Sequence, residues 1–164
     1  PLRGETHQGF SDDSSWARGQ SWAVYGLALC YHYTHEEAIL PLFERVTKYF
    51  IDHLPEDYVP YWDLIFSDGS CEPRDTSAAA IAACGILEME KYYHNQEFLD
   101  IAKKMMSSLS EKYTTVDYLQ SNGIIKDGMY SRKHGHKSEC TSWGDYFYLE
   151  ALMRMKKSDW KIYW

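Results

Sequence analysis

Residues 6–34, THQGFSDDSSWARGQSWAVYGLALCYHYT, begin as a polar, aromatic segment and continue from Trp16 as an almost uninterrupted apolar run. Side-chain oxygens of residues 13–15 (Asp-Ser-Ser) can accept hydrogen bonds from the first free N–H groups of a helix, so the sequence predicts a helix beginning near Trp16. Arg18 and Trp22 are four residues apart and share one face of that helix. Because a helix N-terminus favours anions, Arg18 is expected to face a negatively charged group.

That negative group has two interpretations. Arg18 can form a structural ion pair with Asp12 or Asp13, or it can bind the carboxylate of a ligand, which matches the fork of a guanidinium. The residues of this segment leave both open. Adjacent residues do not naturally face each other across a sugar, so we interpret Asp12 and Asp13 as structural and not as a glycosidase carboxylate pair.

Helical segments of two kinds alternate along the chain. Segments that are apolar over most of their surface are typical of an inner layer, and segments with one apolar face are typical of an outer layer. The inner kind is expected at residues 16–33, 78–93 and 143–157, and the outer kind at 35–54 and 95–113. Polar caps near Ser14, Thr76 and Thr141 precede the inner segments, which indicates a repeat of helix pairs. The sequence predicts an all-α (α/α)6 toroid with about half of the ring in this chain; an open solenoid is the alternative.

In such a ring the long loops before the inner helices gather at one mouth, where function is expected. A mouth that combines tryptophans, one arginine and a few amides is typical of a site for an acidic sugar. The residues expected there are His7, Gln8, Trp16, Arg18, Trp22, Trp62, the 131–137 loop and Trp143. The alternative is that Gln8 is a solvated loop amide and that Trp16 and Trp22 fill the core.

The single basic cluster of this chain is Arg132-Lys133-His134-Gly135-His136-Lys137. It is interpreted either as a solvated loop or as a binding site for an anion such as sulfate. Two histidines two residues apart, without a third ligand type nearby, are a weak metal signal, so no metal site is predicted.

Composition excludes some partners. A net charge of -7 and the absence of a basic stripe argue against nucleic acid. The longest apolar run, residues 22–31, is too short to span a bilayer, so no membrane partner is predicted. The four cysteines are widely spaced, and Cys30 and Cys84 are expected to be small buried hydrophobes. This use of cysteine is typical of a reduced, cytoplasmic protein.

Four stretches together resemble the unsaturated glucuronyl hydrolases, glycoside hydrolase family 88: THQGFSDDSSWARGQSWAVYG, PYWDLIFSDG, PRDTSAAAIAACGILEMEKYY and SWGDYFYLEALMR. That family has an (α/α)6 barrel and acts on unsaturated disaccharides that lyases release from glycosaminoglycans such as chondroitin and hyaluronan. The resemblance implies that Gln8, Trp16, Arg18 and Trp22 line the pocket around the unsaturated uronyl ring. Arg18 would hold the carboxylate, the tryptophans would stack on or wall the sugar, and Gln8 would bind its hydroxyls.

The resemblance also implies a reaction and indicates which part of the catalytic domain this chain represents. The family hydrates the C4=C5 vinyl ether with a catalytic aspartate and needs no metal or organic cofactor. That aspartate and a second one that supports it lie upstream of the His7-Gln8-Gly9 motif, so no catalytic residue is expected in this chain. Residues 1–164 would then be the C-terminal half of a single α/α-barrel catalytic domain. Ser131 and Lys137 fall where some members bind sulfate, but their loop does not match that pattern cleanly.

Two other functions are weighed against this one. The first is an unsaturated rhamnogalacturonyl hydrolase, which would share the fold and the mechanism. The second is a non-catalytic helical-repeat interaction module, in which the aromatic residues would serve packing. Half a ring would expose the apolar flanks of inner helices, so the chain alone is expected to self-associate or to be poorly soluble.

Overall fold

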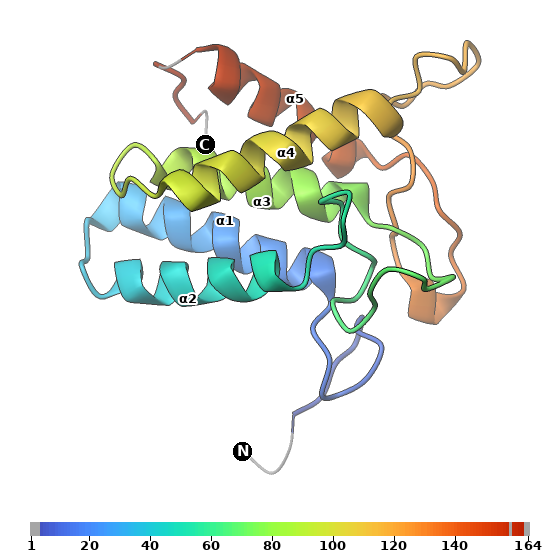
Figure 1. Ribbon diagram of the computed structural model, residues 1–164, viewed down its shortest axis with the longest axis horizontal. Coiled ribbons are helices and arrows are strands. Elements are labelled where there is room, and N and C mark those ends of the chain that lie inside the picture. The colour runs from blue at the N-terminus through green and yellow to red at the C-terminus, as the bar shows by residue number, and fades with distance from the viewer. Residues whose placement is uncertain (1–3, 158, 163–164) are drawn as a thin grey trace.

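The computed structural model describes residues 4–157 and 159–162, and this part of the chain is helical with irregular connections (Figure 1). The helices are α1 (Ala17–Thr34), α2 (Ile39–Asp52), α3 (Thr76–Met89), α4 (Gln96–Lys112), the short 3-10 helix η1 (Arg132–His134) and α5 (Ser142–Lys156). Outside the helices, the described backbone forms isolated β-bridges and no strand. The predicted all-α class is confirmed.

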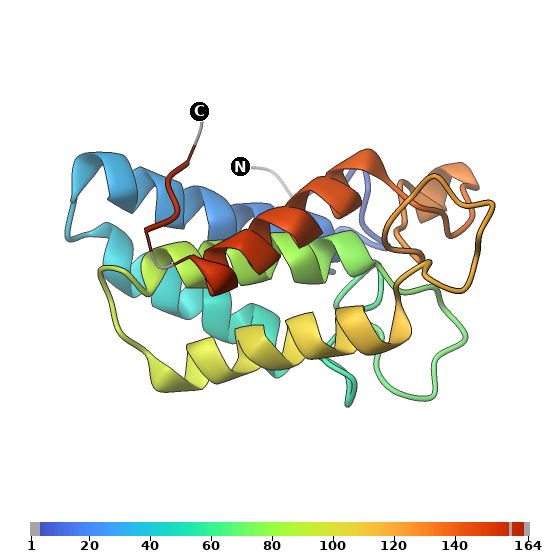
Figure 2. The same ribbon diagram turned by 90° about the horizontal axis from the view of Figure 1, so that it is seen from above.

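The helices form two layers. Figure 2 shows α1, α3 and α5 running in the same direction along one side, with α2 and α4 returning along the other. Helix α3 packs between α1 and α5, while α2 covers α1 and α4 covers α3. This is the predicted alternation of inner and outer helices, with boundaries within a few residues of those expected.

Burial explains the two kinds of segment. Every residue of α3 except Leu87 is buried, because neighbours cover the helix on all sides. Helices α2 and α4 each bury one stripe, which contains Phe43 and Phe50 in α2 and Phe98 and Met105 in α4. One-sided burial of this type is what an amphipathic outer helix requires.

Helices α1 and α5 each have exposed apolar residues. Leu149 of α5 and Trp22 of α1 are examples. The prediction for the cysteines is therefore half right: Cys84, on α3, is buried, whereas Cys30, on α1, is exposed. Apolar sequence in α1 did not ensure burial, because the described chain has no element to cover these residues.

Three of the helices begin with a side-chain cap. Asp75 accepts a hydrogen bond from the Ser77 N–H, Asn95 from the Phe98 N–H, and Thr141 from the Gly144 N–H. Such caps satisfy N–H groups that a first helical turn leaves free.

The cap predicted for α1 is wrong. Its N-cap residue is Trp16, without a side-chain hydrogen bond, and the Ala17 N–H donates to the Trp62 carbonyl instead (3.0 Å). The Ser14 hydroxyl bonds to the Ser11 carbonyl and to Asp63. A neighbouring segment therefore supplies the acceptor that the local sequence was expected to supply.

Candidate functional site

The loops that precede the inner helices gather at one end of the molecule, beside the N-termini of α1, α3 and α5 (Figures 1 and 2). A cavity of about 190 Å³ opens there. All four residues predicted to line a pocket lie in its wall, together with two aromatic residues from later in the chain: Gln8, Trp16, Arg18, Trp22, Tyr130 and Trp143. The structure thus brings together residues from the start of the chain and from the segment before α5.

Arg18 is almost fully buried and tightly bonded. Its Nη1 lies 2.9 Å from the Asp75 carboxylate and donates to the Met129 carbonyl (2.7 Å) and the Ser77 hydroxyl (3.2 Å). Its Nη2 donates to the Tyr130 carbonyl (2.6 Å). The negative group expected near Arg18 therefore exists, and it is Asp75.

The predicted partners Asp12 and Asp13 are wrong. Both are exposed, and the Asp12 carboxylate accepts a hydrogen bond from the Thr6 N–H. Asp75 lies 57 residues beyond Arg18 and reaches it because α3 begins beside the start of α1. Pairing across that sequence separation cannot be read from local spacing.

Burial affects both members of this pair. It lowers the pKa of Arg18, an effect that the Asp75 carboxylate opposes. It raises the pKa of Asp75, while the Arg18 guanidinium and the Ser77 hydroxyl act in the opposite direction. Because Asp75 neutralises Arg18, the charge at the start of α1 does not by itself require an anionic ligand. Among the described residues the Arg18 Nε has no hydrogen-bond partner and Nη2 has one, so N–H groups remain for a ligand.

Two tryptophan rings hold the guanidinium between them. The Cζ atom of Arg18 lies 4.8 Å from the centroid of Trp16 and 5.2 Å from that of Trp143. Tyr130 continues this wall, with its ring 5.7 Å from Trp143. Trp22, 38% exposed, stands edge-on to Phe147 (5.1 Å). The cavity is therefore walled by aromatic rings, which suit the apolar face of a sugar.

Tyr130 was not predicted. It lies in an irregular loop without periodicity, and the one local signal was an aromatic residue just before the basic cluster. Its backbone carbonyl, which holds Arg18, carries no residue-specific signal at all.

Gln8 reaches the cavity on a loop that Asp63 holds. The buried Asp63 carboxylate accepts hydrogen bonds from the Phe10 N–H and the Ser14 hydroxyl, each at 2.8 Å. Gly9 fits this turn closely, since a Cβ there would lie 2.8 Å from the Thr6 hydroxyl oxygen. The Oε1 atom of Gln8 is buried and has no partner within residues 4–157 and 159–162.

The sequence model of Glycosyl Hydrolase Family 88 matches residues 3–158. The chain belongs to this family. An unsaturated chondroitin disaccharide hydrolase of Streptococcus pneumoniae is 48% identical over 170 residues, which covers 100% of this chain and 43% of that protein.

Solved structures agree with the family 88 assignment. The unsaturated glucuronyl hydrolase of Streptococcus agalactiae superposes with a TM-score of 0.93 at 46% identity, covering 100% of this chain and 43% of that one. A variant of that enzyme complexed with dGlcA-GalNAc6S gives a TM-score of 0.91. The helices are therefore those of an (α/α)6 barrel, not of an open solenoid, and the chain spans less than half the length of the relatives it matches.

Trp62 does not join the cavity of this family 88 chain, contrary to the prediction. It is 3% exposed, and its Nε1 donates to Glu72 (2.9 Å). It lines a neighbouring cavity of about 210 Å³ with Phe10, Glu72, Arg132 and Lys133. The 62–64 segment pairs through its backbone with the start of α1, and the Trp62 ring lies outside the lining of the Arg18 cavity.

Part of the basic cluster is bonded to the rest of the chain. Arg132 pairs with Glu72 (3.2 Å), and the Lys133 ammonium donates to the Thr6 carbonyl (3.1 Å). Ser131 is buried, with its hydroxyl 2.5 Å from the His134 Nδ1. Because these bonds occupy Arg132, Lys133 and Ser131, they favour a structural loop and not an open anion site.

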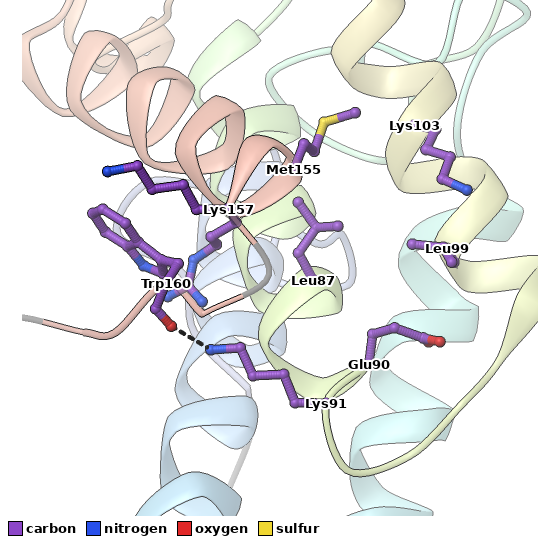
Figure 3. Close-up of a pocket in the computed structure, with 9 residues that line it drawn as sticks. Leu87, Glu90, Lys91, Leu99, Lys103, Met155, Lys157 and Trp160 are labelled. Atoms are coloured by element: carbon purple, nitrogen blue, oxygen red, sulfur yellow. Dashed lines mark hydrogen bonds between the residues drawn. The ribbon is translucent and has the colours of Figure 1, made fainter.

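A larger cavity, of about 290 Å³, lies at the other end of the inner layer between α3, α4 and α5 (Figure 3). Leu87, Leu99 and Met155 supply its apolar lining, and Lys91 at its edge donates to the Trp160 carbonyl (3.0 Å). It lies away from the loops that precede the inner helices and contains none of the predicted site residues.

The described part of the chain contains neither a membrane-spanning helix nor a group of metal-binding side chains. Within it, no helix combines the length and apolarity needed to cross a bilayer. Across the same residues, no three His, Cys, Asp or Glu side chains are grouped so that they could hold a metal ion.

Proposed function

We propose that this chain forms part of the substrate pocket of an unsaturated glucuronyl hydrolase that acts on disaccharides released by lyases from chondroitin or hyaluronan. The observation that carries this proposal is the convergence of Gln8, Trp16, Arg18 and Trp22 on one aromatic cavity beside the N-termini of the inner helices. The names of similar proteins support it, since they are unsaturated chondroitin disaccharide and unsaturated glucuronyl hydrolases.

Each wall residue has a role in this proposal. The Trp16 and Trp22 rings cover the apolar face of the unsaturated uronyl ring. The Gln8 amide, which can both donate and accept, bonds to sugar hydroxyls. The N–H groups of Arg18 that the protein leaves without an acceptor donate to the substrate carboxylate.

The reaction needs a group that the cavity does not contain. Hydration of the C4=C5 vinyl ether places a proton on C4 and a water oxygen on C5, and the resulting hemiketal opens and releases the second sugar. A carboxyl group suits this general acid–base work, yet no aspartate or glutamate is among the residues that line the cavity. We therefore place the catalytic aspartate outside residues 1–164, which serve as the C-terminal half of one α/α-barrel domain.

The cellular setting belongs to the same proposal. Cys30, Cys71, Cys84 and Cys140 are unpaired, which fits a reducing compartment such as the cytoplasm. We place the enzyme there, in the breakdown of glycosaminoglycan fragments, without nucleic acid or metal.

An activity comparison tests this function. The isolated chain and the complete protein that carries it are each given unsaturated chondroitin disaccharide, and loss of the ultraviolet absorbance of the C4=C5 bond is followed. We expect the complete protein to remove the absorbance and the isolated chain to leave it unchanged. Activity of the isolated chain would place the catalytic acid within it, and inactivity of both would overturn the proposed function.

Arg18→Ala in the complete protein tests the site itself. Removing Arg18 takes away the proposed carboxylate donor and the support between Trp16 and Trp143, so binding of the disaccharide should be abolished. An interaction module that does not bind sugar would keep its partner binding in this variant.

A further inference from the structure

The geometry points to Asp75 as a positioning residue of the sugar pocket: it holds Arg18, and through Arg18 the tryptophan walls, without touching the substrate. This inference rests on the proposed function and extends it to a residue outside the cavity lining. Asp75 is fully buried at the first position before α3.

Both carboxylate oxygens of Asp75 are occupied. Oδ2 accepts from the Arg18 guanidinium (2.9 Å). Oδ1 accepts from the Ser77 N–H (3.2 Å), the Ser77 hydroxyl (2.5 Å) and the Met129 N–H (3.4 Å). One side chain therefore joins the start of α1, the start of α3 and the loop before α5.

Arg18 passes this restraint on to the cavity. Its two terminal nitrogens bond to the Met129 and Tyr130 carbonyls, and Trp16 and Trp143 flank its plane. A guanidinium free to rotate would lose both carbonyl bonds and its place between the rings. Asp75 thus fixes the position of the aromatic wall of the cavity, although its own side chain is not part of that wall.

The negative charge of Asp75 and its positioning of Arg18 predict opposite changes in substrate binding when Asp75 is substituted. An aspartate behind Arg18 opposes the binding of an anionic substrate, so its neutralisation would strengthen binding if charge were its main effect. If positioning is its main effect, neutralisation disorders the wall and weakens binding. Stronger substrate binding would therefore indicate the charge effect, and weaker binding would indicate the positioning effect.

Asp75→Asn in the complete protein makes this test. Asparagine caps a helix about as well as aspartate, so the hydrogen bond to the Ser77 N–H is retained while the ion pair is lost. We expect kcat/KM for unsaturated chondroitin disaccharide to fall about tenfold or more, at a temperature where the variant is fully folded. The near-ultraviolet circular dichroism of the tryptophans should change in the ligand-free protein, because the rings on Arg18 move.

Asp57→Asn is the matched control. Asp57 also pairs with an arginine, Arg74 (3.4 Å), but lies outside the aromatic cavity. Its kcat/KM should equal that of the wild type. Ser77→Ala is a milder second variant, since it removes the hydroxyl that joins Asp75 to Arg18 and leaves both charges; a loss of about threefold is expected.

Unchanged or increased kcat/KM in Asp75→Asn would overturn the inference and leave the proposed function standing. If Asp75→Asn does not fold, unchanged activity of Ser77→Ala overturns it instead. A wild-type protein without activity on the disaccharide would overturn the proposed function, and the inference with it.

Discussion

Gly19 packs against the ring of Trp16 so closely that no side chain larger than hydrogen fits without movement of the ring. A Cβ at this position would lie 2.8 Å from the Trp16 Cε3. In Gly19→Ala we expect the ring to move, and affinity for the unsaturated disaccharide to fall about tenfold, since small displacements at a binding wall are costly. Quenching of tryptophan fluorescence or the KM of the complete protein measures this.

Gly26→Ala is the control on the same helix, since no atom other than those of its chain neighbours and its own helix backbone lies within 4 Å of a Cβ at this position. Its affinity should match that of the wild type. Equal affinity in Gly19→Ala would show that Trp16 is not a wall of the sugar site.

The crossing of α1 and α3 depends on another glycine. A Cβ on Gly85 would lie 2.7 Å from the Cα of Tyr25, so the two helix backbones are in direct contact. Gly85→Ala should lower the free energy of unfolding by about 1–3 kcal/mol, because backbone atoms cannot make room without separating the helices. Urea denaturation of the chain measures this. Gly26→Ala should change it in the opposite direction, by about 0.5–1 kcal/mol, and a stabilising Gly85→Ala would contradict the close crossing.

A buried charged cluster joins the three inner helices, and none of its members lines the sugar cavity. Glu88 of α3 bonds to Arg154 of α5, to Lys91 and to His32 of α1. Arg154 also pairs with Glu150 (2.7 Å), which accepts from the Tyr25 hydroxyl (3.0 Å). The three inner helices thus share one network of charges.

Acid should weaken this network. Burial alone would raise the pKa of Glu88, but hydrogen bonds from Lys91 and Arg154 outweigh it and hold the pKa below its ordinary value of 4.5. A carboxylate with a lowered pKa stabilises the fold fully above its unfolded-state pKa, and this stability is lost as pH falls through the folded-state pKa. We expect the free energy of unfolding to fall with pH below about pH 4.5, as followed by urea denaturation across acid pH.

Glu88→Gln provides the comparison. It should be destabilised at neutral pH by about 1.5–3 kcal/mol, because Arg154 keeps Glu150 but loses the charge-assisted hydrogen bond that Glu88 accepts. Its stability should then depend less on pH in the acid range. An acid dependence as steep as that of the wild type would show that other carboxylates carry the effect.

At the scale of the whole molecule, α5 presents an uncovered apolar stripe. Tyr146, Leu149 and Leu152 are exposed on α5, and Trp22 and Tyr33 are exposed on α1. We expect the isolated chain to self-associate through this stripe, since exposed apolar patches of this extent promote association. Sedimentation equilibrium of the chain, with Leu149→Lys/Leu152→Lys as the variant, measures it.

The double variant should shift the chain toward monomer. Leu42→Lys, at an exposed position of the outer helix α2, should leave association unchanged. A wild-type chain that is a monodisperse, cooperatively melting monomer would contradict the prediction.

The helices and their layers could be predicted from the amino-acid sequence, because both follow from local features. The spacing of apolar residues along the chain distinguished α3, which is apolar on all sides, from α2 and α4, which are apolar on one side. Asp75, Asn95 and Thr141 cap helices where polar residues precede apolar runs. Family motifs also selected the four residues that meet at the aromatic cavity.

Only the tertiary structure decided how those residues are held. Arg18 pairs with Asp75 instead of its sequence neighbours, Tyr130 enters the wall, and Trp62 turns into a second cavity. The reason is physical: each outcome depends on where a segment tens of residues away comes to rest, and a buried ion pair or ring contact forms with whichever group packing brings near. Spacing along the chain specifies faces of helices, whereas contacts between the ends of different helices arise only when the layers assemble.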